Sequence, residues 1–155
     1  MVRSLTKFYT VPGLRLGFAV AGQGWIGAMK RLQVEWSVNG LAQRIGQEVL
    51  GDGDYAQATR EWLRQESAWL TQALTGLGFQ VTPSAANYLL FRIPADWGVT
   101  IHSLQEAMGK RGILLRSAAT YQGLGAQYGR TAIRSREDNM RLAEELAACL
   151  DQLRR

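Results

Sequence analysis

The chain of 155 residues is poor in two residue types that many functional sites require, with one cysteine and one histidine. A single cysteine excludes an internal disulfide and a cysteine-based metal cluster. Cys149 shares its expected helical face with four leucines, Leu142, Leu146, Leu150 and Leu153. We therefore expect a buried thiol rather than a nucleophile. His102 stands at an expected helix start with no acidic partner nearby to orient it, which disfavours a role as catalytic base.

Long apolar runs are also missing. No stretch of about twenty apolar residues occurs, which argues against a membrane span. Residues 1–4 lead into a strand-like motif rather than a secretory signal, so we expect a cytoplasmic location. With 46% hydrophobic and 20% charged residues and five tryptophans, the composition is typical of a folded domain.

The formal net charge of +5 raises the question of nucleic-acid binding. The basic residues are scattered, however, and several arginines alternate with acids on expected helices. These are Arg60, Arg64, Arg136 and Arg141. Such alternation is typical of a solvated helix face. The charge pattern therefore disfavours a nucleic-acid partner.

Two short segments carry the most chemistry: SLTK at 4–7 and GLRLG at 13–17. They contribute an amine, two hydroxyls and a guanidinium, from Lys7, Ser4, Thr6 and Arg15. A lysine amine forms a Schiff base with a carbonyl, and hydroxyls with an arginine suit a phosphate dianion. Pyridoxal phosphate carries both an aldehyde and a phosphate. The structural alternative is a strand end with a solvated lysine, followed by a turn.

These segments, together with WSVNGLAQ at 36–43, resemble fold-type I pyridoxal phosphate enzymes of the class I and II aminotransferase family. Within the family the resemblance is greatest to the threonine-phosphate decarboxylase branch, a near relative of histidinol-phosphate aminotransferase. The resemblance implies that Lys7 carries the cofactor. It also implies that the cofactor phosphate is held by Ser4, Thr6 and Arg15.

The same resemblance implies two substrate-binding arginines in the second half of the chain. The position of Arg130 grips the substrate carboxylate in the family, and that of Arg116 assists at the substrate anion. A charge-assisted hydrogen bond of this kind contributes about 1.5–3 kcal/mol. The alternative for each is a surface arginine on an edge strand. No metal ligand set is expected.

Family members are more than twice as long, and their cofactor lysine lies past the midpoint. We therefore expect the carboxyl-terminal portion of such an enzyme, with residues 1–53 as a remnant of the large domain. Residues 54–155 would form the small domain, entered through a long helix. In the family, the acid at the pyridine nitrogen and the stacked aromatic ring come from upstream, and no residue here can be assigned either role. The family also implies a homodimer.

The apolar periodicity predicts a mixed α/β fold whose second part is an α+β layer, with a short antiparallel sheet covered by helices. Strands are expected at 14–21, 79–82, 88–93, 113–116 and 130–134. Helices are expected at 25–32, 39–50, 55–77 and 101–110, and a last one after Ser135. A turn at 51–54 ends the first part. Ser135 and Asp138 have the spacing of a helix start.

A competing motif, GQGWIG at 22–27, fits G-x-G-x-x-G between an expected strand and an expected helix. A dinucleotide-binding unit also needs a second parallel strand that ends in an acid about twenty residues on. Residues 35–50 instead indicate a turn and a helix. The glycines are better explained as a flexible junction.

The resemblance implies decarboxylation of L-threonine O-3-phosphate to aminopropanol phosphate in cobalamin biosynthesis, as part of a longer or split enzyme. An aminotransferase acting on histidinol phosphate or a similar substrate stays open, since an arginine for the carboxylate occurs in both. One departure concerns Glu35, which stands where relatives usually carry proline. A non-catalytic folded remnant or subunit is the third interpretation, because this chain lacks half of a cofactor pocket.

Overall fold

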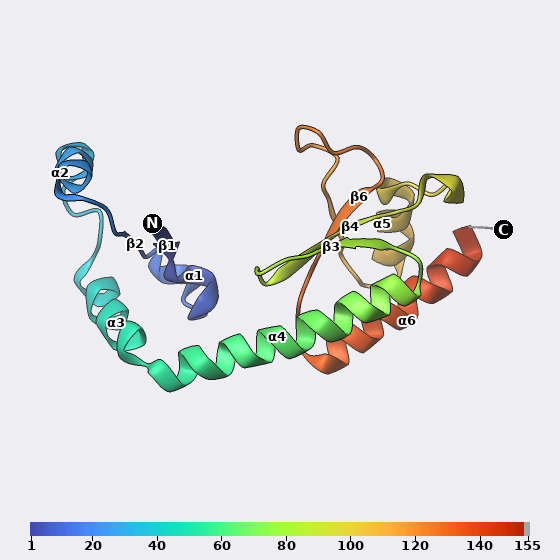
Figure 1. Ribbon diagram of the computed structural model, residues 1–155, viewed down its shortest axis with the longest axis horizontal. Helices are drawn as coiled ribbons and strands as arrows, with labels where there is room; N and C mark the ends of the chain where they lie inside the picture. The colour runs from blue at the N-terminus through green and yellow to red at the C-terminus, as the bar shows by residue number, and fades with distance from the viewer. Residues whose placement is uncertain (154–155) are drawn as a thin grey trace. The chain divides into compact units, whose positions relative to one another are not determined.

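The computed structural model describes residues 1–153, which fold into two compact units. The first covers Met1–Thr59 and the second begins at Arg60. The division falls inside the long helix α4, Gly53–Gly76 (Figure 1). The sequence predicts a domain boundary between residues 53 and 54, a few residues before this division.

A two-stranded antiparallel ribbon opens the first unit. Strand β1, Val2–Ser4, pairs with β2, Gly17–Ala19, so that Ser4 lies opposite Gly17. The connection holds α1, Leu5–Phe8, and a 3₁₀ turn, Pro12–Leu14. The prediction of a buried strand over 14–21 is wrong in extent and burial. The 3₁₀ turn occupies its start, and β2 is not buried.

Helices α2, Gln23–Leu32, and α3, Gly40–Gly51, lie where the periodicity predicts them. Helix α3 starts after Asn39 because the Asn39 side chain accepts a hydrogen bond from Ala42 N at 2.8 Å. The expected turn at 51–54 is reduced to one residue, Asp52. Its carboxylate accepts from Tyr55 N at 2.9 Å, so α4 begins directly after α3 ends.

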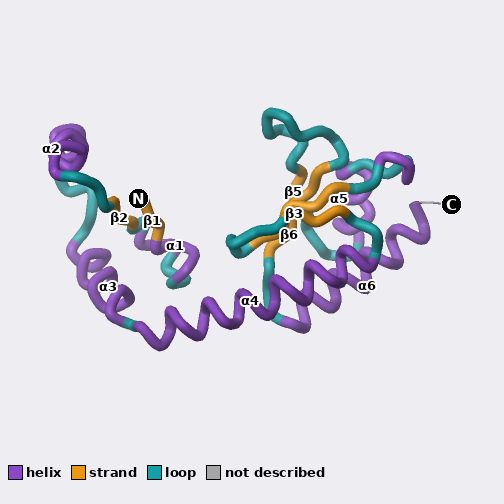
Figure 2. The backbone as a smooth tube through the Cα atoms, in the orientation of Figure 1, coloured by secondary structure: helices purple, strands orange, loops and turns teal. Residues whose placement is uncertain are grey.

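A four-stranded antiparallel sheet forms the centre of the second unit (Figure 2). Its order is β3, Gln80–Thr82; β4, Tyr88–Arg92; β6, Tyr128–Ala132; and β5, Arg116–Ser117. Strands β3 and β4 differ from their predicted bounds by one residue, and β5 and β6 by more. The turn after α5 holds Ile113, whose N–H donates to Met108 O, so β5 starts only at Arg116. Arg134 N donates to the Asn139 side chain and lies outside the ladder.

Three helices cover one face of this sheet: α4, α5 (Ile101–Lys110) and α6 (Arg136–Leu153). Fully buried side chains fill the space between, among them Leu70, Leu89, Phe91, Leu104, Leu146 and Cys149. The prediction of a buried Cys149 is confirmed, and burial raises the pKa of this thiol. Because side chains alternate along a strand, Arg130 and its pairing partners Leu90 and Arg116 share the opposite face. The predicted antiparallel sheet with covering helices is confirmed.

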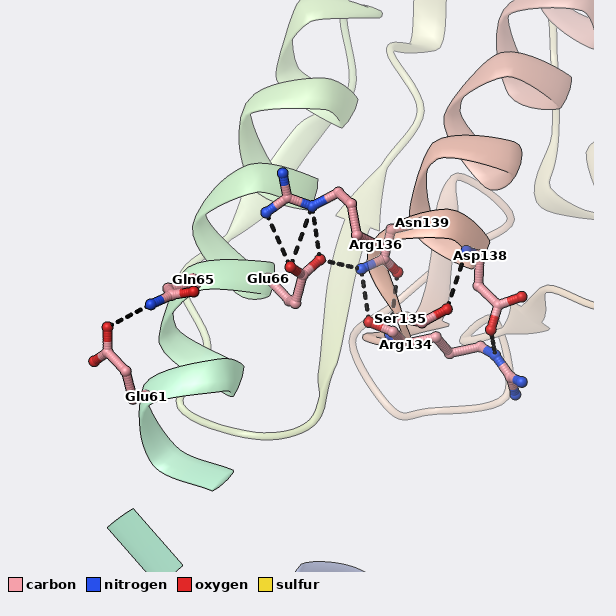
Figure 3. A network of polar contacts seen from close by, with 8 residues as sticks. All are labelled: Glu61, Gln65, Glu66, Arg134, Ser135, Arg136, Asp138 and Asn139. Carbon is pink, nitrogen blue, oxygen red and sulfur yellow. Dashed lines mark hydrogen bonds and ion pairs between the residues drawn. The ribbon is translucent and has the colours of Figure 1, made fainter. Parts of the chain in front are cut away.

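A polar network joins α4 to the start of α6 (Figure 3). The buried Glu66 carboxylate accepts hydrogen bonds from Arg136 at 2.9 and 3.1 Å and from Asn139 at 3.0 Å. These donors hold the pKa of Glu66 below its ordinary value. Asn139 also bonds both backbone groups of Arg134. The segment that follows β6 is thereby fixed to two helices.

Candidate active site

The proposed cofactor-binding residues begin at the junction between β1 and α1. Ser4 ends the strand, and its hydroxyl accepts a hydrogen bond from Thr6 N at 3.4 Å. This turn leaves Ser4 and Lys7 exposed, while Thr6 is buried. A single short turn therefore presents two hydroxyl residues and the lysine from adjacent positions.

The chain then returns to bring Arg15 beside this turn. Helix α1 contacts both the 3₁₀ turn and β2, and Leu5 N donates to Leu16 O at 3.0 Å. Gly17 makes the close return possible, since a Cβ there would lie 2.7 Å from the Arg3 carbonyl oxygen. Gly17 belongs to the GLRLG segment, but this steric requirement depends on the β1–β2 pairing and has no signal in the sequence.

Two residues in this loop adopt left-handed backbone conformations that favour glycine. Thr10 has a φ of 52° and Arg15 a φ of 50°. Such strain, which costs about 1–3 kcal/mol per residue, gathers at functional sites. Neither residue type signals a positive φ, so the sequence alone offers no way to find it. Both strained residues lie in the segment that follows Lys7 and ends at Arg15.

These residues fit the aldehyde and phosphate parts of pyridoxal phosphate. Across residues 1–153, no hydrogen-bonded carboxylate neutralises Lys7 or Arg15, so their charges face outward. The exposed amine matches the aldehyde, and the guanidinium with two hydroxyls matches the phosphate. No described residue can be assigned to the pyridine nitrogen. Groups of histidine, cysteine, aspartate and glutamate that could hold a metal are likewise absent from the described residues.

The proposed substrate arginines lie on neighbouring strands of the second unit. Arg116 and Arg130 are direct partners in the β5–β6 ladder. Directly opposed like charges destabilise a sheet, yet within the described chain neither guanidinium has an ion pair. Four other arginines in this unit pair with acids: Arg64 with Glu61, Arg111 with Glu145, Arg134 with Asp138 and Arg136 with Glu66. Two more, Arg92 and Arg141, donate instead to the Gln80 side chain and to the Arg111 carbonyl oxygen.

Arg116 and Arg130 are therefore opposed like charges that have no ion-pair partner within residues 1–153. Arg134, which alternates with Arg130 in the sequence, does not belong to the pair, because its side chain is bound to Asp138 at 2.8 Å. His102 is exposed at the start of α5. The proposed cofactor residues lie on the first unit and the proposed substrate arginines on the second.

The fold and these residues define part of a fold-type I pyridoxal phosphate-dependent enzyme. The chain belongs to the aminotransferase class I and II family, whose family model matches residues 1–146. Enzymes of this family depend on pyridoxal phosphate. The predicted family and cofactor are thereby confirmed. The dinucleotide-binding interpretation of residues 22–27 is wrong. The family match includes that segment, and the described sheets are antiparallel, whereas a dinucleotide-binding unit requires parallel strands.

Two curated relatives illustrate the similarity. Threonine-phosphate decarboxylase of Salmonella typhimurium is 45% identical over 148 residues, which cover 94% of this chain and 40% of that protein. Histidinol-phosphate aminotransferase of Oleidesulfovibrio alaskensis is 35% identical over 121 residues, covering 78% of this chain and 32% of that protein. The chain thus spans well under half the length of these relatives.

Solved structures of the same two kinds of enzyme also match this chain over part of their length. Histidinol-phosphate aminotransferase from Clostridium acetobutylicum superimposes with a TM-score of 0.90 at 25% identity, over 97% of this chain and 45% of that chain. L-threonine-O-3-phosphate decarboxylase from Porphyromonas gingivalis superimposes with a TM-score of 0.81 at 25% identity, over 97% and 46%. No described helix is long and apolar enough to cross a membrane.

Proposed function

We propose that this chain supplies the cofactor lysine and the substrate arginines of a cytoplasmic decarboxylase that converts L-threonine O-3-phosphate to aminopropanol phosphate in cobalamin biosynthesis. The observation that carries the proposal is the 45% identity to the Salmonella typhimurium threonine-phosphate decarboxylase over 94% of this chain. The unpaired cations of both units support it, because the substrate and the cofactor are anions.

On the first unit, Arg15 with Ser4 and Thr6 would hold the cofactor phosphate, and the Lys7 amine would hold its aldehyde carbon. When bound, pyridoxal phosphate supplies an electron sink for the charge left as a bond to the substrate Cα breaks. Lys7 Nζ is exposed, and it would hold a proton next to the reacting carbon.

On the second unit, Arg130 would bind the α-carboxylate and Arg116 the substrate phosphate. A guanidinium offers parallel N–H donors that match a carboxylate or phosphate. Their direct opposition across the β5–β6 ladder would place two anion-binding groups side by side. The pair would select substrates with two anionic groups over simple amines.

An aminotransferase acting on histidinol phosphate or a related substrate is the second candidate. The TM-score of 0.90 to the Clostridium acetobutylicum enzyme favours it. Arg130 does not separate the two reactions, because both families place an arginine at this position. Identity is higher to the decarboxylase, at 45% against 35%, which is why we rank decarboxylation first.

A complete site also needs protein that this chain does not provide. An acid at the pyridine nitrogen and a stacking aromatic ring would come from an amino-terminal portion, on the same or a separate polypeptide. A homodimer would follow from the family. If no such portion exists, a non-catalytic subunit is the remaining interpretation.

A complementation assay tests the proposal. The chain is mixed with pyridoxal phosphate and the amino-terminal portion of the Salmonella typhimurium enzyme, and supplied with O-phospho-L-threonine. We expect aminopropanol phosphate by mass spectrometry, and none with the Lys7→Ala variant. A keto product formed from L-histidinol phosphate and 2-oxoglutarate in a parallel mixture would favour the aminotransferase. No product from either substrate with a folded, complemented chain would contradict both.

A further inference from the structure

Tyr88 packs against the guanidinium of Arg130. The Arg130 Cζ atom lies 4.6 Å from the centroid of the Tyr88 ring. In the β4–β6 ladder Arg130 pairs with Leu90 and Tyr88 pairs with Ala132, so the two side chains are diagonal neighbours on one face. Diagonal neighbours across antiparallel strands are within reach of aromatic and long side chains.

The contact leaves the hydrogen-bond donors of Arg130 available. A cation over a ring is attracted by the π-face of that ring, and this attraction uses none of the five N–H donors of arginine as a hydrogen bond. Across residues 1–153, no carboxylate forms an ion pair with Arg130. The side chain is therefore oriented without being neutralised.

We propose that Tyr88 is a positioning residue that orients the Arg130 guanidinium for an anionic group of the substrate, an inference that rests on the proposed function. A free arginine side chain has many rotamers, and binding an anion must restrict them. Restricting them beforehand reduces the entropy lost on binding. The backbone next to Tyr88 is itself fixed, because Ile133 N donates to Asn87 O at 3.0 Å where β4 begins.

Arg116 provides an internal comparison, because it carries the same group directly opposite Arg130. Its side chain is exposed, and the described rings form no stack with it. Of the two proposed substrate arginines, only Arg130 is thus held by a ring in the described structure.

A second stacked arginine on the same face supplies a matched control. The Arg92 guanidinium lies over the Tyr128 ring at 5.9 Å, and Arg92 Nη1 also donates to the Gln80 side chain at 3.3 Å. One Arg92 donor is thus used within the sheet, whereas the buried Arg92 Nε has no hydrogen-bond partner among the described residues. Tyr128→Leu therefore removes a comparable ring from the same sheet without touching the Tyr88 and Arg130 contact.

The test is NMR of the full chain with ¹⁵N-labelled arginine, in which Arg130→Lys assigns the Arg130 Nε–H signal and Arg116→Lys that of Arg116. In the parent chain we expect the Arg130 signal to be shifted upfield by the ring and to be more ordered than that of Arg116. Tyr88→Leu should abolish both features and Tyr88→Phe should keep them. Tyr128→Leu should leave Arg130 unchanged.

Titration with O-phospho-L-threonine then measures the consequence. We expect Tyr88→Leu to weaken binding about two- to five-fold, as for loss of a partly exposed cation–π contact, and Tyr88→Phe to restore it. The positioning role is overturned if Arg130 is as mobile as Arg116 in the parent chain, a comparison that needs no variant at Tyr88. It is also overturned if Tyr88→Leu, with a folded amide spectrum, leaves the Arg130 signal and the affinity unchanged.

Failure of the proposed function gives a different result. In that case O-phospho-L-threonine would shift neither Arg130 nor Arg116 in the parent chain, while the order of Arg130 would still depend on Tyr88. That outcome would overturn the anionic substrate assigned to Arg130.

Discussion

The two units differ most in where their large apolar side chains lie. In residues 60–153 most of them gather in one core between the sheet and three helices, where Phe91 and Leu104 are fully buried, while Leu114 is 92% exposed. In residues 1–59 many of them face outward: Trp36 is 96% exposed and Leu32 86%. Burial of apolar surface is the dominant favourable term in folding. We therefore expect residues 60–153 to contribute most of the folding stability of the chain.

This difference bears on function. The proposed cofactor residues lie on the unit with little core, whereas the proposed substrate arginines lie on the unit with a complete one. Contiguous exposed apolar surface marks sites of protein contact. We expect other protein, from the rest of the parent enzyme or its second subunit, to cover residues 1–59 in the working enzyme.

The largest effect is expected from a core substitution in the second unit. Phe91 is fully buried and meets Phe79 edge to face at 5.1 Å. Phe91→Ala should cost about 3–5 kcal/mol through lost burial and a cavity. Urea unfolding with hydrogen exchange measures it, and slowly exchanging amides should fall within 60–153. Equal protection of residues 1–59 would refute the contrast between the units.

Breaking the Glu66 network should have the next largest effect. Glu66→Gln removes a buried carboxylate that holds Arg136 and Asn139, at a cost of about 1.5–3 kcal/mol at neutral pH. The folded pKa of Glu66 lies below its ordinary value of 4.5. Its contribution is therefore present above about pH 4.5 and is lost as the pH falls through the lowered folded pKa.

The pH dependence separates this effect from a general packing defect. Denaturant unfolding of parent and Glu66→Gln should differ most near neutral pH, and the two should converge in acid. A difference in unfolding free energy that stays constant down to pH 3 would argue against the carboxylate as its source.

Two glycines test the units separately. A Cβ at Gly129 would lie 2.5 Å from the Phe91 ring, so Gly129→Ala should cost about 1–3 kcal/mol by overpacking the core. Gly17→Ala would meet the Arg3 backbone at 2.7 Å and should disturb the β1–β2 ribbon instead. Thermal unfolding should detect the first, and cofactor binding the second. If Gly129→Ala weakened cofactor binding and Gly17→Ala lowered the unfolding temperature, stability would not depend mainly on the second unit, nor cofactor binding on the first.

The smallest predicted effect concerns helix caps. The Ser135 hydroxyl accepts from Asp138 N at 3.2 Å, and Ser135→Ala should cost about 1 kcal/mol in the main unfolding transition. Asn39→Ala removes an equivalent cap in the first unit and should leave that transition unchanged. If calorimetry finds equal shifts for both variants, the units unfold as one.

Sequence reasoning found most of the fold because local signals agree with tertiary packing. The bounds of α5 are as predicted, and Ser135 caps α6 as its spacing with Asp138 indicates. The errors lie where long-range hydrogen bonds decide. Strand β6 ends at Ala132, short of the predicted Arg134. The N–H and C=O groups of Arg134 are hydrogen-bonded to the Asn139 side chain of the following helix rather than to a neighbouring strand.

Some features of the candidate site could likewise be predicted from local sequence, and others depend on the folded backbone. Residue chemistry and spacing pointed to Lys7 and Arg15, whereas the strain at Arg15 and the steric need for Gly17 emerge only from the folded backbone. The pairing of Arg116 with Arg130 depends on strand register, which the sequence does not specify for so short a strand as β5.

The central claim is that Lys7 carries pyridoxal phosphate, and one measurement tests it directly. The purified chain is treated with pyridoxal phosphate and borohydride, its intact mass is measured, and the adduct is mapped by peptide digestion beside a Lys7→Ala control. Our account predicts a single adduct on Lys7 that is absent from the control. An adduct on Lys30 or Lys110 instead, or none on a chain shown to be folded, would contradict it.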